Sequence, residues 1–186
     1  MPSLAPPGLE ILAGAILGRQ ILAGMVSASP QPDQPELCFM DLRDATVSAS
    51  CLRESVVAYR NVMRRPGSNI YPVVANVSAE TAEELFTVMD LSGDAIMSCR
   101  LTDGVMSGVR IVGRLDGKLR LTLDLVDEMR VADTASLRER LPEEGVPTLW
   151  NNRLSALVAK GLVAEFPAGR AKQFKSISEM GGADGR

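Results

Sequence analysis

Hydrophobic and polar positions in the first part of the chain, residues 1–115, follow two alternating periods. The short apolar runs 37–42 and 70–77 have the length and composition of buried strands. Between them, in residues 50–65, apolar side chains recur at the spacing of one helix face. Strands that alternate with helices predict a layered α/β unit in which helices pack against a sheet.

The remaining elements of this part follow from capping and turn residues. Ser78 is predicted to cap a helix. The apolar face of that helix would consist of Ala82, Leu85, Phe86 and Met89. The Asp103-Gly104 turn then separates two more predicted strands, 95–101 and 109–115.

The apolar stretch 8–26 is long enough to be considered as a membrane segment. Arg19 and Gln20 fall near its middle. An Arg at the centre of a spanning helix costs about 2.5–3.5 kcal/mol on insertion scales, and the uncharged run 11–18 is too short to span a bilayer alone. We therefore expect a buried amphipathic element and no membrane association.

After residue 116 the pattern changes to three helices followed by a hairpin. The predicted bounds are 118–130 for the first helix, a cap at Asp133 or Thr134 and an end at Pro142 for the second, Pro147 to Gly161 for the third, and strands 162–166 and 171–177. We expect two domains, 1–115 and 116–178. The Gly-rich residues 179–186 are predicted to form a disordered tail.

Composition narrows the chemistry that the chain can perform. His is absent from all 186 residues, which excludes His-based acid–base catalysis, His-dependent nucleophile triads and mixed Cys/His zinc sites. Cys38, Cys51 and Cys99 are widely spaced, which predicts reduced thiols in a cytoplasmic protein. Neither a G-x-G-x-x-G nor a phosphate-loop motif occurs. We expect no enzyme activity, no cofactor and no metal.

Charge is unevenly distributed along the chain. Residues 1–146 carry 14 Lys/Arg against 20 Asp/Glu, whereas residues 147–186 carry 6 Lys/Arg against 3 Asp/Glu. The overall net charge of −3 argues against a protein that coats nucleic acid indiscriminately. The basic C-terminal segment nevertheless leaves room for one local basic face.

Residues 148–174, TLWNNRLSALVAKGLVAEFPAGRAKQF, contain the pattern x-x-L-x-x-L-x-x-x-G-L-V. The matching positions are Leu154, Leu157, Gly161, Leu162 and Val163. This segment resembles the recognition helix and wing of bacterial winged-helix transcriptional regulators, in which such a helix leads into a basic β-hairpin. The resemblance implies a C-terminal winged helix domain that binds double-stranded DNA.

The outer face of this helix supplies the candidate DNA-binding residues. Trp150, Leu154 and Leu157 share the inner face, and we interpret Trp150 as a core anchor. The predicted contacts are Thr148, Asn151, Asn152, Arg153 and Ser155 on the helix, and Arg170, Lys172 and Lys175 on the hairpin. Asn reads adenine and Arg reads guanine bidentately in the major groove, whereas hairpin cations hold phosphates. Simple solvation is the alternative for each polar side chain.

Residues 40–60, MDLRDATVSASCLRESVVAYR, end a strand near Asp41 and place Ser50 near the start of a helix. This arrangement resembles the STAS-like family, relatives of anti-sigma-factor antagonists, in which a strand ends in D-hydrophobic-x-G-V and a Ser-containing turn opens the next helix. Here Asp44 replaces the usual Gly, and Ala49 stands where Asp often precedes the Ser. The resemblance implies a STAS-like first domain with a regulatory phosphorylation site at Ser50. A plain helix cap is the alternative role for Ser50.

Two functions from different classes follow from these patterns. The first is a DNA-binding transcriptional regulator whose STAS-like domain serves as a regulatory or dimerisation module. The second is a partner-switching protein-interaction module, similar to an anti-sigma antagonist, without specific DNA binding. We favour the first, with duplex DNA as the partner and with a homodimer or a regulatory protein at the STAS-like domain.

Overall fold

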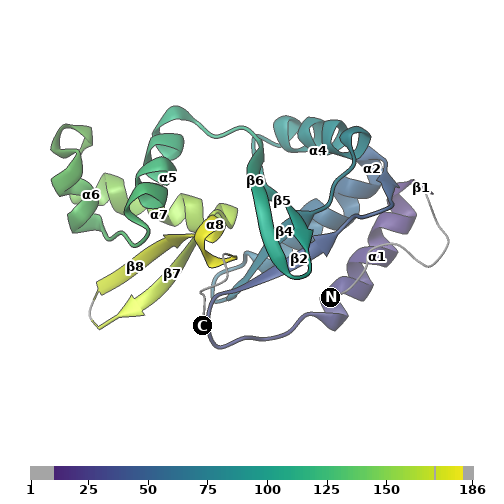
Figure 1. Ribbon diagram of the computed structural model, residues 1–186, viewed down its shortest axis with the longest axis horizontal. Helices are drawn as coiled ribbons and strands as arrows, with labels where there is room; N and C mark the ends of the chain where they lie inside the picture. The colour runs from purple at the N-terminus through teal and green to yellow at the C-terminus, as the bar shows by residue number, and fades with distance from the viewer. Residues whose placement is uncertain (1–10, 170, 182–186) are drawn as a thin grey trace.

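The protein has a mixed α/β architecture, and the computed structural model describes residues 11–169 and 171–181 (Figure 1). Its central sheet has the strand order β2-β4-β5-β6. These strands are β2 (Glu36–Asp41), β4 (Ile70–Ala75), β5 (Ala95–Thr102) and β6 (Val105–Gly113). Strands β2, β4 and β5 are parallel, and β6 pairs with β5 in the antiparallel direction. The predicted α/β class is confirmed.

One face of the sheet packs against the helices of the first part of the chain. These helices are α1 (Ala15–Ala28), α2 (Ala49–Leu52), α3 (Ala58–Met63) and α4 (Ala79–Leu91). A π-helical turn, Arg53–Val57, joins α2 to α3, so these segments form one continuous helix. The sheet residues Met40, Val74 and Ile96 lie in the same hydrophobic cluster as helix residues such as Leu85. Two short strands, β1 (Ile11–Leu12) and β3 (Thr46–Val47), pair in parallel beside the sheet.

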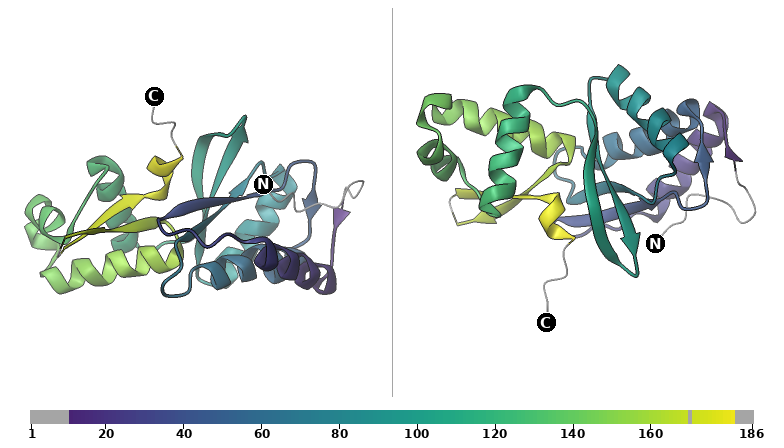
Figure 2. Two further views of the ribbon diagram at one scale, coloured as in Figure 1. Left: turned by 90° about the horizontal axis from the view of Figure 1, so that it is seen from below. Right: turned by 45° about the horizontal axis from the view of Figure 1, so that its top comes forward.

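The opposite face of the sheet packs against the C-terminal part, which lies at one end of the molecule (Figures 1 and 2). Its elements are α5 (Gly117–Met129), α6 (Thr134–Arg140), the 3-10 turn Pro142–Glu144, α7 (Pro147–Lys160), β7 (Val163–Ala168), β8 (Ala171–Ser176) and α8 (Ile177–Met180). Val73 and Met97 of the sheet share a hydrophobic cluster with Trp150 and Leu157 of α7. The domain boundary expected near residue 115 lies between β6 and α5, but one cluster of apolar side chains extends across it.

Capping residues decide where several helices begin and end. Ser78 caps α4 as predicted, since its hydroxyl accepts a hydrogen bond from the Thr81 backbone N–H at 3.2 Å. Of the two candidates for α6, Asp133 is the cap and Thr134 is the first helical residue. Gly161 ends α7 in the left-handed conformation (φ 73°), which a residue without a side chain adopts at little cost.

Several details differ from the sequence prediction. The strand predicted at 109–115 is β6, which begins earlier, at Val105, and ends at Gly113. Phe86 does not belong to the buried face of α4, because Leu85 and Met89 turn toward the sheet and leave Phe86 45% exposed. The tail predicted from residue 179 starts inside a helix, because α8 extends to Met180, whose side chain packs on the core. Residues 182–186 lie outside the described residues.

Candidate nucleic-acid interface

Helix α7 is held in place by one apolar face. Trp150, Leu154 and Leu157 recur at helical spacing and are all completely buried. Trp150 is therefore a core residue, as predicted. Pro147 occupies the first turn, where its missing N–H removes no helical hydrogen bond.

The opposite side of α7 is exposed, as the pattern indicates. The exposed residues of the predicted set on this side are Thr148, Asn151, Asn152 and Ser155. Asn151 differs from the others because its Oδ1 accepts a hydrogen bond from the Thr134 hydroxyl, with an O···O distance of 2.5 Å. This contact ties α7 to the start of α6. The neighbouring Asn152 is also exposed, and among the residues that the structure describes its amide has no hydrogen bond to another side chain.

Arg153 does not lie on the outer face. Its side chain is only 12% exposed, and its Nη2 donates to the backbone oxygen of Glu144 at 3.2 Å and to Glu144 Oε2 at 3.3 Å. The guanidinium also lies over the Trp150 ring, with its Cζ 4.9 Å from the ring centroid. The expectation that Arg153 reads guanine is corrected on this geometry, because its donors face the protein interior and the carboxylate of Glu144.

Glu144 joins three elements through ion pairs. Lys118 at the start of α5 donates to Glu144 Oε2 at 2.6 Å, and Arg153 contacts the same oxygen from α7. The hydrogen bond from Lys118, assisted by Arg153, lowers the pKa of the Glu144 carboxyl. The carboxyl is therefore ionised at neutral pH and holds the turn before α7 against α5.

The hairpin cations are also partly engaged. Lys172 Nζ lies 2.9 Å from Glu165 Oε1 on the neighbouring strand, and its side chain is 64% exposed. Lys175 Nζ lies 5.4 Å from the centroid of the Phe166 ring. An exposed ion pair of this kind contributes little to stability, so Lys172 can exchange its partner for a phosphate at small cost. Arg170, the third predicted hairpin contact, lies outside the described residues.

The C-terminal end of α7 is bound to α3 by a cluster that we call the α3–α7 seam, formed by Arg60, Arg64, Asp94 and Lys160. Arg60 is 4% exposed and forms an ion pair with Asp94 through its two terminal nitrogens, Nη1 and Nη2. It also donates to the backbone oxygen of Lys160 at 3.1 and 3.2 Å. Lys160 Nζ completes the cluster at 2.7 Å from Asp94 Oδ1.

Arg64 adds a hydrogen bond and an aromatic contact to the α3–α7 seam. Its Nε donates to the backbone oxygen of Val158 at 3.2 Å, and its Cζ lies 3.9 Å from the centroid of the Tyr71 ring. The last carbonyls of a helix have no partner within the helix. Arg60 of α3 donates to the carbonyl of Lys160, and Arg64, just after α3, donates to that of Val158, which also accepts from the Gly161 N–H at 2.9 Å. These contacts fix the direction of α7 relative to the sheet.

Sequence reasoning missed the seam. The helical run 50–65 shows Arg60 as a polar position between apolar ones. The available signal was its spacing, since Val56 and Met63, four positions before it and three after it, are both buried. That spacing places Arg60 on the inner face of the helix.

Ser50 is not the helix cap. The cap is Ser48, whose hydroxyl accepts a hydrogen bond from the Cys51 backbone N–H at 3.4 Å. Ser50 lies inside the first turn of α2, with its Oγ 3.2 Å from Ser48 Oγ. The plain-cap interpretation is therefore corrected. The regulatory interpretation of Ser50 stays a prediction.

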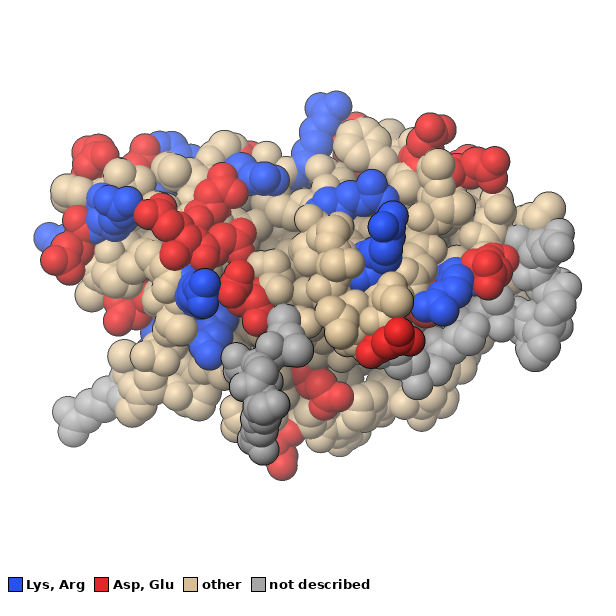
Figure 3. Space-filling model, viewed as in Figure 1, with Lys and Arg blue, Asp and Glu red and all other residues tan. Residues whose placement is uncertain are grey.

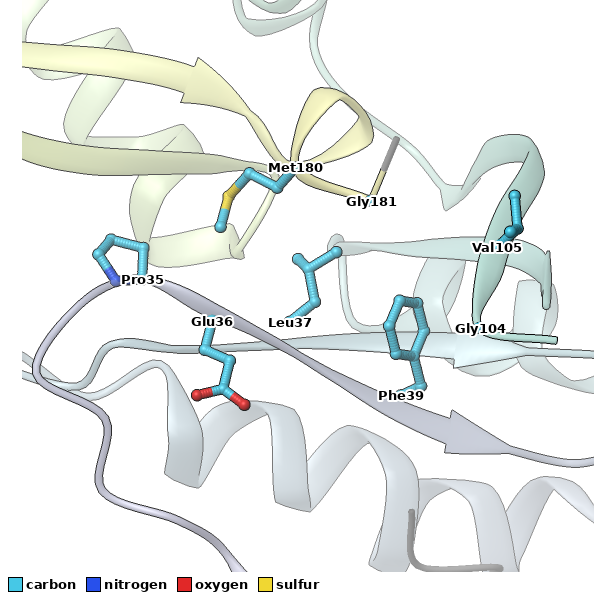
Figure 4. Close-up of a pocket in the computed structure, with 8 residues that line it drawn as sticks. All are labelled: Pro35, Glu36, Leu37, Phe39, Gly104, Val105, Met180 and Gly181. Atoms are coloured by element: carbon cyan, nitrogen blue, oxygen red, sulfur yellow. The ribbon is translucent and has the colours of Figure 1, made fainter. Parts of the chain in front are cut away.

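A separate groove of about 360 Å³ lies between α8, the start of β2 and the β5–β6 turn (Figure 4). Leu37 and Phe39 project from β2 toward the side of Met180, whereas Glu36 projects to the other side of the strand (Figure 4). Glu36 is the one ionisable side chain in the lining. The groove therefore offers apolar contact and no set of acid and base groups.

Comparison with known proteins does not assign a family. The chain matches no family model, and the searches of the curated proteins and of the solved structures likewise find no similar protein. Within the part of the chain that the structure describes, no helix combines the length and the apolar character needed to cross a membrane.

Proposed function

We propose that this protein is a double-stranded DNA-binding regulator in which α5–α7 and the β7–β8 hairpin form a winged helix domain. The order of helix, helix, helix and hairpin supports this assignment. A further contact supports it as well: Ala132, between α5 and α6, pairs with Phe174 of β8 through two backbone hydrogen bonds of 2.9 and 2.8 Å. This bridge attaches the connection between the first two helices to the hairpin.

The observation that carries the proposal is that α7 is amphipathic. One face is fully buried by Trp150, Leu154 and Leu157, and the other is exposed and lined by small polar side chains. A helix that enters the major groove must present such a row to the base edges while its other face stays in the protein core. The hydrogen bonds from Arg60 and Arg64 to the C-terminal end of α7 hold these polar side chains in one orientation.

The contacts of α7 suggest different roles for the neighbouring amides. Asn152 is the proposed base-reading residue, with Thr148 and Ser155 beside it on the same exposed side. Asn151 is proposed to position α7 against α6, because its oxygen is already bonded to Thr134. Lys172 and Lys175 are proposed to contact phosphates, together with Arg170 of the predicted set.

The first part of the chain is proposed to be a STAS-like regulatory or dimerisation module. Parallel strands β2, β4 and β5, with helices on one face and the continuous helix from Ala49 to Met63, support this proposal. That helix runs from the Ser48–Ser50 turn to Arg60 in the seam. It thus connects the proposed regulatory turn with the end of the proposed recognition helix.

The test begins with selection of duplexes from a random-sequence pool on the purified protein. The selected duplex and a scrambled duplex are then titrated by fluorescence anisotropy at several salt concentrations. We expect Asn152→Ala to weaken binding to the selected duplex by on the order of 1–3 kcal/mol, with a much smaller effect on the scrambled duplex. The matched control is Gln20→Ala on the exposed side of α1, which should bind both duplexes as the parent does.

The hairpin is tested in the same titrations. Lys172→Ala combined with Lys175→Ala should weaken binding to both duplexes and flatten the log–log salt slope by about 0.9 for each phosphate that the variant no longer neutralises. If no duplex is enriched and the parent shows no salt-dependent binding, DNA recognition is wrong and the protein-interaction function takes its place. An unchanged salt slope in the double variant would remove the hairpin from the interface.

A further inference from the structure

The pairing of β5 with β6 is interrupted next to two arginines, Arg100 and Arg110. Ser98 pairs with Arg110, but two residues later Arg100 pairs with Ser107, so two residues of β6 lie opposite Cys99. This is a β-bulge, and Gly108 occupies it with φ 56°, a left-handed conformation that glycine adopts readily. Bulges of this kind often redirect side chains next to binding sites.

The bulge places the side chains of Arg100, Ser107 and Arg110 on one face of the hairpin. In a regular strand, residues 107 and 110 would point to opposite faces, because they are an odd number of positions apart. Ser98 and Arg100 lie two positions apart on β5 and therefore point to the same face of the sheet. Because of the extra residue in β6, their partners Arg110 and Ser107 point to that face as well. Arg100, Ser107 and Arg110 therefore line one pocket.

The arginine pocket, as we call this cavity of about 260 Å³, has two arginines as its charged lining residues. Its lining residues are Asn76, Val77, Cys99, Arg100, Ser107, Gly108 and Arg110. None of them is acidic, and neither arginine forms an ion pair with any residue in the described ranges 11–169 and 171–181. Burial raises the pKa of the Cys99 thiol to about 11, so this wall is uncharged at neutral pH. Blue atoms, which mark positively charged side chains, lie over the β5–β6 hairpin in the view of Figure 3.

Asn76 gives the pocket a rigid wall. It follows β4 in a left-handed conformation with φ 56°. Its Oδ1 accepts from the Leu101 backbone N–H at 3.0 Å, and its Nδ2 donates to the Leu101 oxygen at 3.1 Å and to Asp41 Oδ1 at 3.0 Å. The ends of β2, β4 and β5 are thereby held together. Asp41 also forms an ion pair with Arg43, outside the pocket. Neither Arg100 nor Arg110 has a carboxylate partner among the described residues.

We propose that the arginine pocket binds the phosphate group of a small phosphate monoester. A planar guanidinium matches phosphate oxygens bidentately, and Ser107 supplies a further hydroxyl donor. The volume lies slightly below the range of about 300–1,000 Å³ for pockets that enclose a whole ligand. The pocket therefore has room for the phosphate and for the adjoining part of the monoester, but not for a whole larger ligand. This site is formed by the sheet and does not depend on DNA binding by α7.

The experiment is an amide NMR titration of the full chain at constant ionic strength, in separate arms with inorganic phosphate and with ribose 5-phosphate. The expected result is a saturable shift of the amides of residues 76–77, 99–100 and 107–110 in the ribose 5-phosphate arm. Arg100→Ala combined with Arg110→Ala should weaken this binding by about tenfold or more. The charge-matched control, Arg19→Ala combined with Arg120→Ala on α1 and α5, should bind within about twofold of the parent.

The outcomes separate the sources of phosphate. Tighter binding of ribose 5-phosphate than of inorganic phosphate supports a monoester ligand. Equal affinity in the two arms would reject the monoester and reassign the pocket to free phosphate. The absence of a saturable shift at the pocket in both arms, or equally weakened binding in both double variants, would overturn the site. The amide spectrum of each variant also reports whether it is folded, so loss of structure cannot be mistaken for loss of binding.

Discussion

The α3–α7 seam and the arginine pocket contain the same residue type in opposite surroundings. In the seam, the Arg60 side chain is 5% exposed and its donors are shared between a carboxylate and helix carbonyls. In the pocket, Arg100 and Arg110 are exposed, and within the described ranges neither has an ion pair. The surroundings decide what each arginine does. A buried guanidinium with complete partners fixes structure, whereas an exposed one without a carboxylate remains available to an anion.

The difference also separates stability from binding. A buried charge whose partner is removed is costly, because water cannot replace the missing interaction. Exposed charges are solvated and screened, so their removal changes stability little. Substitutions in the seam should therefore act on folding, and substitutions in the pocket on ligands.

The largest expected effect is at Asp94. Asp94→Ala removes the carboxylate that Arg60 and Lys160 share and leaves Arg60 buried without a counter-charge. We expect the free energy of unfolding to fall by about 3 kcal/mol, measured by urea denaturation. The matched control is Asp124→Ala, which removes an exposed pair with Arg120 and should cost less than about 0.5 kcal/mol. Equal destabilisation in the two variants would show that the seam is no stronger than a surface ion pair.

A smaller effect is expected from acid. Burial alone would raise the pKa of Asp94, but the hydrogen bonds from Arg60 and Lys160 outweigh it and lower the pKa below the ordinary value of 3.8. A carboxyl whose pKa is lowered by folding stabilises the protein above its unfolded pKa, and this stabilisation is lost as the pH falls through the folded pKa. The parent should therefore lose stability more steeply than Asp94→Asn below about pH 4. Urea denaturation between about pH 6 and about pH 2.5 measures both slopes, and parallel curves would contradict the assignment.

The smallest expected effect is in the arginine pocket. Arg100→Ala combined with Arg110→Ala should change the free energy of unfolding by less than about 0.5 kcal/mol, because neither side chain is buried or ion-paired among the described residues. Urea denaturation without added phosphate provides the measurement. A destabilisation as large as that of Asp94→Ala would mean that these arginines are structural, and the comparison with the seam would fail.

Apolar spacing predicted α7 and its buried face well. Trp150, Leu154 and Leu157 occupy the core as expected, and the small polar residues between them are exposed. The outer-face prediction failed for Arg153, because Trp150 three positions before it and Leu157 four positions after it are buried, so helical spacing places Arg153 beside the inner face. Its long side chain then reaches the carboxylate of Glu144. Nothing in the local pattern indicates that Glu144 lies within reach of Arg153, and that contact depends on how the preceding turn folds back.

The two serines at the start of α2 illustrate a finer limit. Ser48 and Ser50 are both suitable N-cap residues, and they lie only two positions apart. Ser48 becomes the cap because its backbone is extended (φ −69°, ψ 155°) and the helix begins at Ala49. Residue preference alone cannot separate two equivalent candidates. Element bounds taken from a sequence are uncertain by this amount for the same reason.

The sequence by itself determined the order of the longer helices and strands, the caps at Ser78 and Gly161 and the buried face of α7. These features arise from interactions between residues close in the chain, such as helical spacing, caps and turns, which the sequence shows directly. Tertiary structure alone decided that Arg60 binds the end of α7, that Arg153 pairs with Glu144 and that Arg100, Ser107 and Arg110 share a pocket. Each of these depends on contacts between distant segments or on a shifted strand register, and neither is encoded in local periodicity.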